Sequence, residues 1–233
     1  MKKNILFASL LALAAPVMLT SCGDEESEGL SRITYYAILE LNGDANVTTQ
    51  LGQAYNDPGC VATMAGEDVS DQIVTTGTVN TNALGFYNVN YSVVNPDGFA
   101  ASATRTVAVV DKNNFASTYF GESQYGARHY FNAPINITQR ADGTYLIDDL
   151  GGGMYFYGRY PGYEPTYDFH LEAVLQLNDD NTIEVLAQGN WYWGNGAEEN
   201  FTIDTANYDP ATGTVTFVMY FGSATPYYVT LTK

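Results

Sequence analysis

The chain has 233 residues, and its 26 acidic side chains against 9 Lys and Arg give a net charge of −17. So acidic a protein is a poor partner for nucleic acid, because that binding depends on Lys and Arg neutralising phosphates. Anionic lipid heads would repel it as well, which excludes a basic patch as the means of membrane binding.

The chain begins with two lysines and an uncharged run from Ile5 to Leu19. This run is too short to span a membrane and predicts a secretory signal over residues 1–21. Its end, Leu19-Thr20-Ser21-Cys22, resembles the lipobox of bacterial lipoproteins. The resemblance implies cleavage before Cys22 and acylation of that residue, whose thiolate is the nucleophile that accepts lipid. An ordinary secreted protein with a chance cysteine is the alternative.

Residues 22–31 are expected to form a tether. The run Gly23-Asp24-Glu25-Glu26-Ser27-Glu28 is charged and lacks apolar side chains, a composition typical of disorder. It resembles the acidic stretch after the lipidated cysteine in surface-exported lipoproteins of the Bacteroidetes type. That resemblance implies a lipid-anchored outer-membrane protein displayed at the cell surface, and a plain solvated spacer is the alternative. Loss of the signal would remove two lysines and take the net charge from −17 to −19.

Residues 32–111 show period-two alternation and predict a β-sandwich. Tyr87, Val89 and Tyr91 share one face of a predicted strand, and Asn95-Pro96-Asp97-Gly98 predicts the turn of a hairpin. With Cys22 lipidated, Cys60 has no partner for an intramolecular disulfide and is expected to be a small buried residue.

This segment resembles the bacterial Ig-like repeats of surface proteins. The matching pieces are Tyr55-Asn56-Asp57-Pro58-Gly59, Gly85-Phe86-Tyr87-Asn88-Val89-Asn90-Tyr91 and Arg105-Thr106-Val107-Ala108-Val109-Val110-Asp111. The resemblance implies an Ig-like fold with Tyr87 at the tyrosine corner. It also implies a spacer or adhesive role without catalytic residues.

Residues 115–233 predict an antiparallel meander of about eight strands, either a barrel or a two-sheet sandwich. The predicted strands are Ala133–Gln139, Thr144–Asp148, Met154–Tyr160, Asp168–Asn178, Thr182–Trp193, Asn200–Tyr208, Thr214–Gly222 and Pro226–Lys233. Two inward faces are expected, comprising Val215, Phe217, Met219 and Phe221, and Leu171, Ala173, Leu175 and Leu177. A barrel of this size is either filled by side chains or holds one small ligand.

Groups suited to catalysis are scarce. His129 and His170 are the only histidines, and the chain has no Gly-x-Ser-x-Gly elbow. Asp168 and His170 share a predicted strand face, a spacing that surface residues often show by chance. The Asn178-Asp179-Asp180-Asn181 run offers oxygen ligands to calcium but is expected to be a turn. We therefore expect a protein that is not an enzyme and has neither cofactor nor metal.

Aromatic residues concentrate in the second segment, which holds both tryptophans and 14 of the 19 tyrosines. Such rings either pack the core or form a ligand surface, where they stack on sugars and bond hydroxyls. The candidate contacts are Trp191, Tyr192, Trp193, Tyr157 and Tyr160.

The layout resembles two-domain surface lipoproteins of Bacteroidetes-type bacteria, in which an Ig-like domain precedes a β-rich C-terminal domain. We expect a lipoprotein whose C-terminal domain binds a glycan or similar polar polymer. The alternative is a structural or assembly component that contacts an outer-membrane protein partner.

Overall fold

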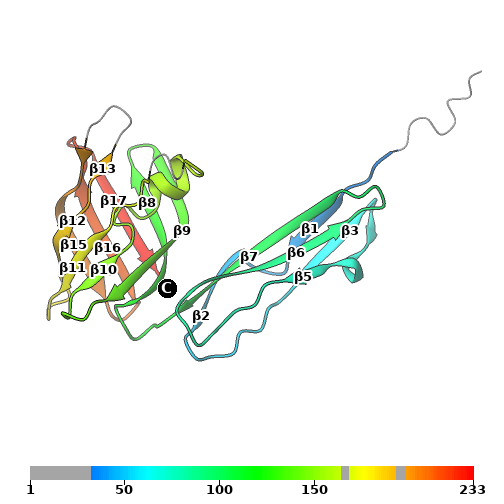
Figure 1. The fold of residues 1–233 in the computed structure, drawn as a ribbon, viewed down its shortest axis with the longest axis horizontal. Helices are drawn as coiled ribbons and strands as arrows, with labels where there is room; N and C mark the ends of the chain where they lie inside the picture. Colours follow the sequence, from blue (N-terminus) through cyan, green and yellow to red (C-terminus); the bar gives the residue numbers. More distant parts are fainter. Residues whose placement is uncertain (1–32, 164–167, 193–197) are drawn as a thin grey trace, which may run out of the picture. The chain divides into compact units, whose positions relative to one another are not determined.

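The computed structural model describes residues 33–163, 168–192 and 198–233. The fold is nearly all-β, as predicted (Figure 1). The helical elements among the described residues are η2, a 3₁₀ turn at Ser70–Gln72, and η3, a π-helix at Met154–Arg159. Neither these nor any other described segment makes a helix of the length and apolar character that crossing a membrane requires.

The first part of the chain forms two small sheets with an apolar core between them. One sheet is antiparallel and consists of β1 (Ala37–Leu41), β3 (Cys60–Met64) and β4 (Glu67–Asp68), in that order. The other has the order β2 (Asn46–Gln50), β7 (Ala100–Val110), β6 (Gly85–Val94) and β5 (Val74–Thr76). Strand β2 runs parallel to β7, and the other pairs are antiparallel.

The predicted hairpin and tyrosine corner are both present. Strands β6 and β7 pair along their length, and Val89 and Tyr91 point into the core. The Asn95 side-chain oxygen closes the turn by accepting hydrogen bonds from the N–H groups of Asp97 (3.1 Å) and Phe99 (2.8 Å). The Tyr87 hydroxyl donates to the carbonyl oxygen of Ala83, four residues upstream, at 3.1 Å. This bond has the form of a tyrosine corner, and the part is an Ig-like domain.

The second part is one eight-stranded antiparallel sheet that curls into a nearly closed barrel (Figure 1). Its strands, in spatial order, are β12 (Ile183–Gln188), β11 (Ala173–Leu177), β10 (Tyr145–Ile147), β9 (Arg128–Gln139), β8 (Ser117–Tyr125), β17 (Pro226–Thr232), β16 (Thr214–Tyr220) and β15 (Thr202–Asp209). Neighbours in the sheet are neighbours along the chain, except that the first strand β8 pairs with the last strand β17.

The seam of the barrel lies between β12 and β15. One bridge joins Thr182 to Asn207. At the other end of β12, the Gln188 side-chain amide donates to the carbonyl oxygen of Phe201 (2.6 Å) and accepts from its N–H (2.9 Å). In a closed barrel, continuous backbone pairing between β12 and β15 would satisfy these N–H and C=O groups. Here a side chain and a single bridge do so, and the two edge strands lie together without continuous pairing.

Side chains fill the barrel interior with one continuous apolar core. The two predicted inward faces are confirmed, because Leu171, Ala173 and Leu175 are buried, as are Val215 and its alternate neighbours Phe217 and Met219. Of the alternatives left open by the sequence, the barrel is the one observed.

Two predicted strand assignments are wrong. Residues 154–160 alternate in a way that predicts a strand but form the π-helix η3, because three preceding glycines turn the chain. The strand predicted to begin at Asp168 begins at Ala173 instead. Strand β8 was not predicted, and a bulge between Gly121 and Ser123 breaks its period-two pattern.

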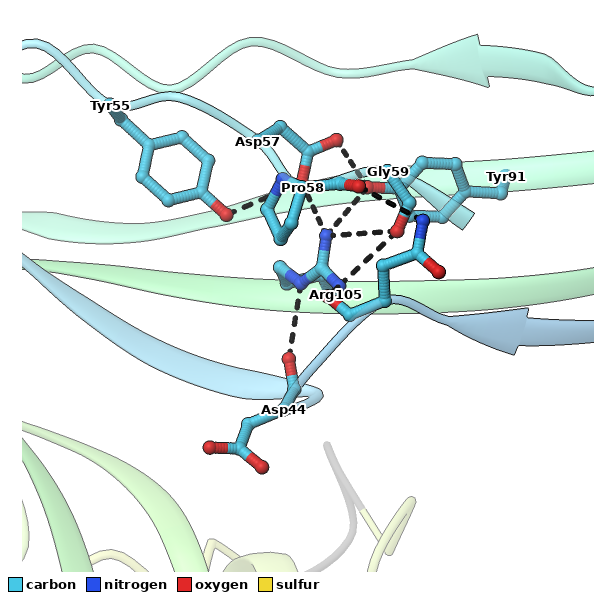
Figure 2. A network of polar contacts seen from close by, with 8 residues as sticks. Asp44, Tyr55, Asp57, Pro58, Gly59, Tyr91 and Arg105 are labelled. Atoms are coloured by element: carbon cyan, nitrogen blue, oxygen red, sulfur yellow. Dashed lines mark hydrogen bonds and ion pairs between the residues drawn. The ribbon is translucent and has the colours of Figure 1, made fainter. Parts of the chain in front are cut away.

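A buried guanidinium joins two loops of the Ig-like domain to β7 (Figure 2). Arg105 is fully buried and forms an ion pair with Asp57. Its Nη1 also donates to the Tyr91 hydroxyl (2.9 Å), its Nη2 to the carbonyl oxygen of Asn42 (2.8 Å) and its Nε to that of Asp44 (3.1 Å). Burial alone would raise the pKa of Asp57, but hydrogen bonds from Tyr91 and Arg105 outweigh it and lower that pKa.

Asp57→Asn should lower the free energy of unfolding by about 3–5 kcal/mol, because it leaves the buried Arg105 charge without its counter-ion. Asp44→Asn is the matched control, since Asp44 contacts Arg105 only through its backbone carbonyl (Figure 2). Urea denaturation of both variants measures the difference, and equal destabilisation would contradict the assignment.

Candidate functional site

A hollow of about 590 Å³ lies at one end of the barrel. Its lining consists of Asp148, Tyr157, Asp168, His170, Glu172, Gly189 and Asn190. Asp148 follows β10, Glu172 precedes β11 and Gly189 follows β12. Because adjacent strands are antiparallel, these three strand ends lie side by side at the same end of the barrel. The volume is in the range of small-molecule sites.

The turn beside the hollow is held by the buried carboxylate of Asp149. One oxygen accepts hydrogen bonds from the N–H groups of Gly151 (2.9 Å) and Leu171 (3.3 Å), and the other accepts from that of Gly153 (3.0 Å). Gly152 and Gly153 have φ of 62° and 82°, values that favour glycine. Asp149 thereby fixes both the turn into η3 and the approach to β11.

The π-helix η3 delivers aromatic side chains to the hollow. Single-turn π segments are frequent at functional sites. Tyr155 points into the core, whereas Tyr157 lines the hollow and is 40% exposed. Between them, Phe156 stacks on the imidazole of His170 with ring centroids 3.4 Å apart. A Cβ on Gly158 would overlap the ring of Tyr130, so a glycine at this position allows η3 to lie against β9.

Three carboxylates give the hollow its polarity. Asp168 accepts a hydrogen bond from the backbone N–H of His170 and contacts its Nδ1, both at 2.9 Å. Asp148 accepts from the N–H (2.9 Å) and side-chain amide (2.7 Å) of Asn136, and burial raises the pKa of Asp148. With Glu172, these groups offer hydrogen-bond acceptors to a ligand rich in donors.

Trp191 lies in the core, so the prediction that its indole offers a face to a ligand is wrong. The ring is completely buried, and its N–H donates to the carbonyl oxygen of Phe169 at 2.7 Å. It packs edge-on against Tyr155 with centroids 4.7 Å apart, and a Cβ on Gly151 would lie 2.9 Å from it. The residue therefore supports the glycine turn from inside the barrel.

The other residues predicted to contact a ligand lie in different places. Tyr157 lines the hollow, whereas Tyr160 is half-buried and stacks on Phe169 with centroids 5.0 Å apart. Tyr192 belongs to β13 (Trp191–Tyr192), which pairs with β14 (Glu198–Glu199), and its side chain is outside the described part. Trp193 and Cys22 also lie outside the described residues. Sequence reasoning missed Glu172 and Asn190 as lining residues, because both fall inside predicted strands whereas the structure places them outside β11 and β12.

The remaining chemical candidates have structural roles. Asp180 accepts hydrogen bonds from the N–H (3.0 Å) and hydroxyl (2.6 Å) of Thr182, which confirms the predicted turn. His129 contacts Glu122 at 2.6 Å, while His170 contacts a different carboxylate. Burial raises the pKa of Cys60, so its thiolate is disfavoured. Within the described ranges, no group of three or more His, Cys, Asp or Glu side chains is placed to hold a metal ion.

Residues 39–109 match the family model of a bacterial surface protein Ig-like domain, and residues 109–233 match the model of a C-terminal domain. The solved lipoprotein BT2262 from Bacteroides thetaiotaomicron is 30% identical, with a TM-score of 0.55. The match covers 85% of this chain and 100% of that one. The chain belongs to the same family as BT2262. Limits of 32–111 and 115–233 for the two domains remain a prediction, as do residues 1–21 as signal and 22–31 as tether.

Two further similarities are weak. Two structures of Clostridium perfringens ZmpB match at 13% identity: the M60 catalytic domain with CBM51-1 and CBM51-2 (TM-score 0.29), and CBM51-2 in complex with GlcNAc with INT domains (TM-score 0.28). They cover 85% and 84% of this chain but 21% and 43% of their own. Such scores do not establish a shared fold. No curated protein matches.

The stability of the barrel should fall as pH rises from 5 to 7, through Asp149. Burial raises the pKa of this carboxyl from 3.8 to about 7. The folded state therefore binds more protons than the unfolded state in this window, and the free energy of unfolding falls by up to about 1.4 kcal/mol per pH unit. Urea denaturation across this pH range should show this slope in the wild type and a shallower one in Asp149→Asn, where the raised pKa of Asp148 still contributes.

Asp142→Asn is the matched control. Asp142 is exposed, and hydrogen bonds from Thr144 lower its pKa, so it is ionised in both states throughout the window. Its substitution should leave the slope as in the wild type. A slope in Asp149→Asn as steep as in the wild type would contradict the assignment.

Proposed function

We propose that this member of the BT2262 family is a non-catalytic envelope lipoprotein whose C-terminal barrel binds a glycan or similar polar polymer. The observation that carries the proposal is the hollow, where Tyr157 lies beside three carboxylates and the amide of Asn190. A phenol ring has a flat apolar face for a sugar ring and a polar edge for its hydroxyls. Carboxylates accept hydrogen bonds from hydroxyl groups and do so strongly.

The composition of the lining argues for binding rather than turnover. Its described residues include no Ser, Thr, Cys or Lys side chain to act as a nucleophile. Carboxylates are the groups that hydrolyse glycosides, but Asp148 and Asp168 are both engaged in hydrogen bonds within the protein. The imidazole of His170 is stacked on Phe156 and bonded to Asp168, so it is held in place by two contacts. These groups form a rigid, hydrogen-bonding wall.

We also propose that Cys22 carries lipid and anchors the mature chain in the outer membrane, at the cell surface. The support is the likeness to a lipoprotein over the whole length of BT2262, together with the lipobox-like sequence before Cys22. The Ig-like domain would then act as a spacer between the anchor and the barrel.

Tyr157→Ala should reduce retention on polysaccharide affinity gels at least about fivefold for any polysaccharide that the wild type binds, if a sugar ring on the phenol matches the about 1–3 kcal/mol that aromatic stacking contributes for nucleic-acid bases. Tyr228→Ala is the matched control, since Tyr228 is similarly exposed, at 45%, but lies on β17 outside the lining. Equal retention of Tyr157→Ala and wild type would remove this residue from the proposal.

Cys22→Ala should abolish lipid attachment, because alanine has no thiol to acylate. The precursor would keep its signal and run larger on a gel. Metabolic labelling with a fatty acid, followed by mass spectrometry of the purified chain, measures both effects. A normally processed Cys22→Ala chain that still pellets with carbonate-washed envelopes would refute the anchor.

A further inference from the structure

A second, smaller recess adjoins the hollow on the outer face of the barrel. Its volume is about 230 Å³, and its lining is mainly apolar. The lining consists of Leu146, Glu172, Ala173, Val174, Ala187, Gln188 and Gly189. Glu172 and Gly189 also line the hollow, so the two are parts of one continuous surface.

The recess depends on a β-bulge. Leu146, Val174 and Ala187 lie opposite one another across β10, β11 and β12. Val174 pairs with Ala187 and Leu175 pairs with Val185, which leaves Leu186 as the extra residue. Without this bulge, the period of two would turn Ala187 to the same face as the inward Val185. Bulges that redirect a side chain in this way are over-represented beside functional sites.

We propose that the hollow and the recess together bind an uncharged sugar that carries a short apolar substituent, namely the methyl of an acetyl or acetamido group or of a deoxy sugar. This inference rests on the proposed function of the hollow. Sugar hydroxyls bond the carboxylates, and the substituent enters the recess between Val174 and Ala187. The lining of the recess is mainly apolar, so it suits an apolar substituent better than the hydroxyl groups of a second sugar ring.

The charge of the surface supports an uncharged ligand. Asp148, Asp168 and Glu172 belong to it, and no Lys or Arg among the described residues lines either part. A uronic acid or a sulfated sugar would place like charges within a few ångströms, which costs binding free energy.

Matched sugar pairs test the substituent. Polyacrylamide conjugates carrying glucose or N-acetylglucosamine, galactose or N-acetylgalactosamine, and galactose or 6-deoxygalactose are compared by biolayer interferometry, with a glucuronic acid conjugate added. In at least one pair the member with the methyl group should bind about fourfold more tightly, the value of one buried CH₂ group. The pair that responds distinguishes an acetamido group from a deoxy methyl.

Ala187→Leu places a larger side chain in the recess and should lower the binding of the substituted member to that of the unsubstituted one. Ala211→Leu, in an exposed turn before β16, is the matched control and should keep the preference. Val174→Ser is a second variant, which makes the recess polar without adding volume. Thermal unfolding verifies that each variant folds.

Some outcomes would overturn this inference but not the proposed function. One is binding to a polysaccharide gel while the two sugars of every pair bind with equal affinity, and another is tightest binding to the glucuronic acid conjugate. A preference that survives in Ala187→Leu does the same. Absence of binding to every conjugate and every gel would instead remove the proposed function, and this inference with it.

Discussion

The site depends on one buried carboxylate. Asp149 accepts backbone hydrogen bonds from two segments that are distant along the chain: Gly151 and Gly153 in the turn before η3, and Leu171 just before β11. A buried carboxylate without such donors would be costly, so the chain at this end of the barrel must keep the geometry that supplies them. The Tyr227 hydroxyl donates to the carbonyl oxygen of Gly151 at 2.7 Å and fixes the same turn from β17. The position of η3, and with it the aromatic wall of the hollow, follows from these bonds.

Much of the fold was predictable because its causes are local. Alternation with a period of two identified the β6–β7 hairpin and the inward faces of β11 and β16, and the turn residues located their ends. Tyr87 was assigned its role from the residues around it, and its hydrogen bond to Ala83 spans four positions. In contrast, Asp57 and Arg105 lay in separate matching pieces of sequence, and only folding brings them into one ion pair. A pattern in the chain cannot show such a long-range contact.

Little of the site was predictable, and the reasons are physical. Its lining residues come from η3 and from the ends of three strands, and their proximity depends on strand pairs whose partners lie up to 30 positions apart. The aromatic residues of η3 alternate as they would in a strand. Whether the segment forms a π-helix depends instead on the preceding glycine turn, which sets its first backbone hydrogen bonds. Trp191 starts a strand of two residues, too short for a period to show which face is buried.

The pairing of β8 with β17 has a consequence for how the protein is made. These strands lie roughly 100 residues apart, so loop-closure entropy must be overcome before they meet. During synthesis, the hydrogen-bonding edge of β8 that pairs with β17 stays unpaired until β17 emerges. A prematurely terminated product would keep two open edges and an uncovered interior, both of which proteases and chaperones recognise. The barrel can therefore close only after β17 has been made.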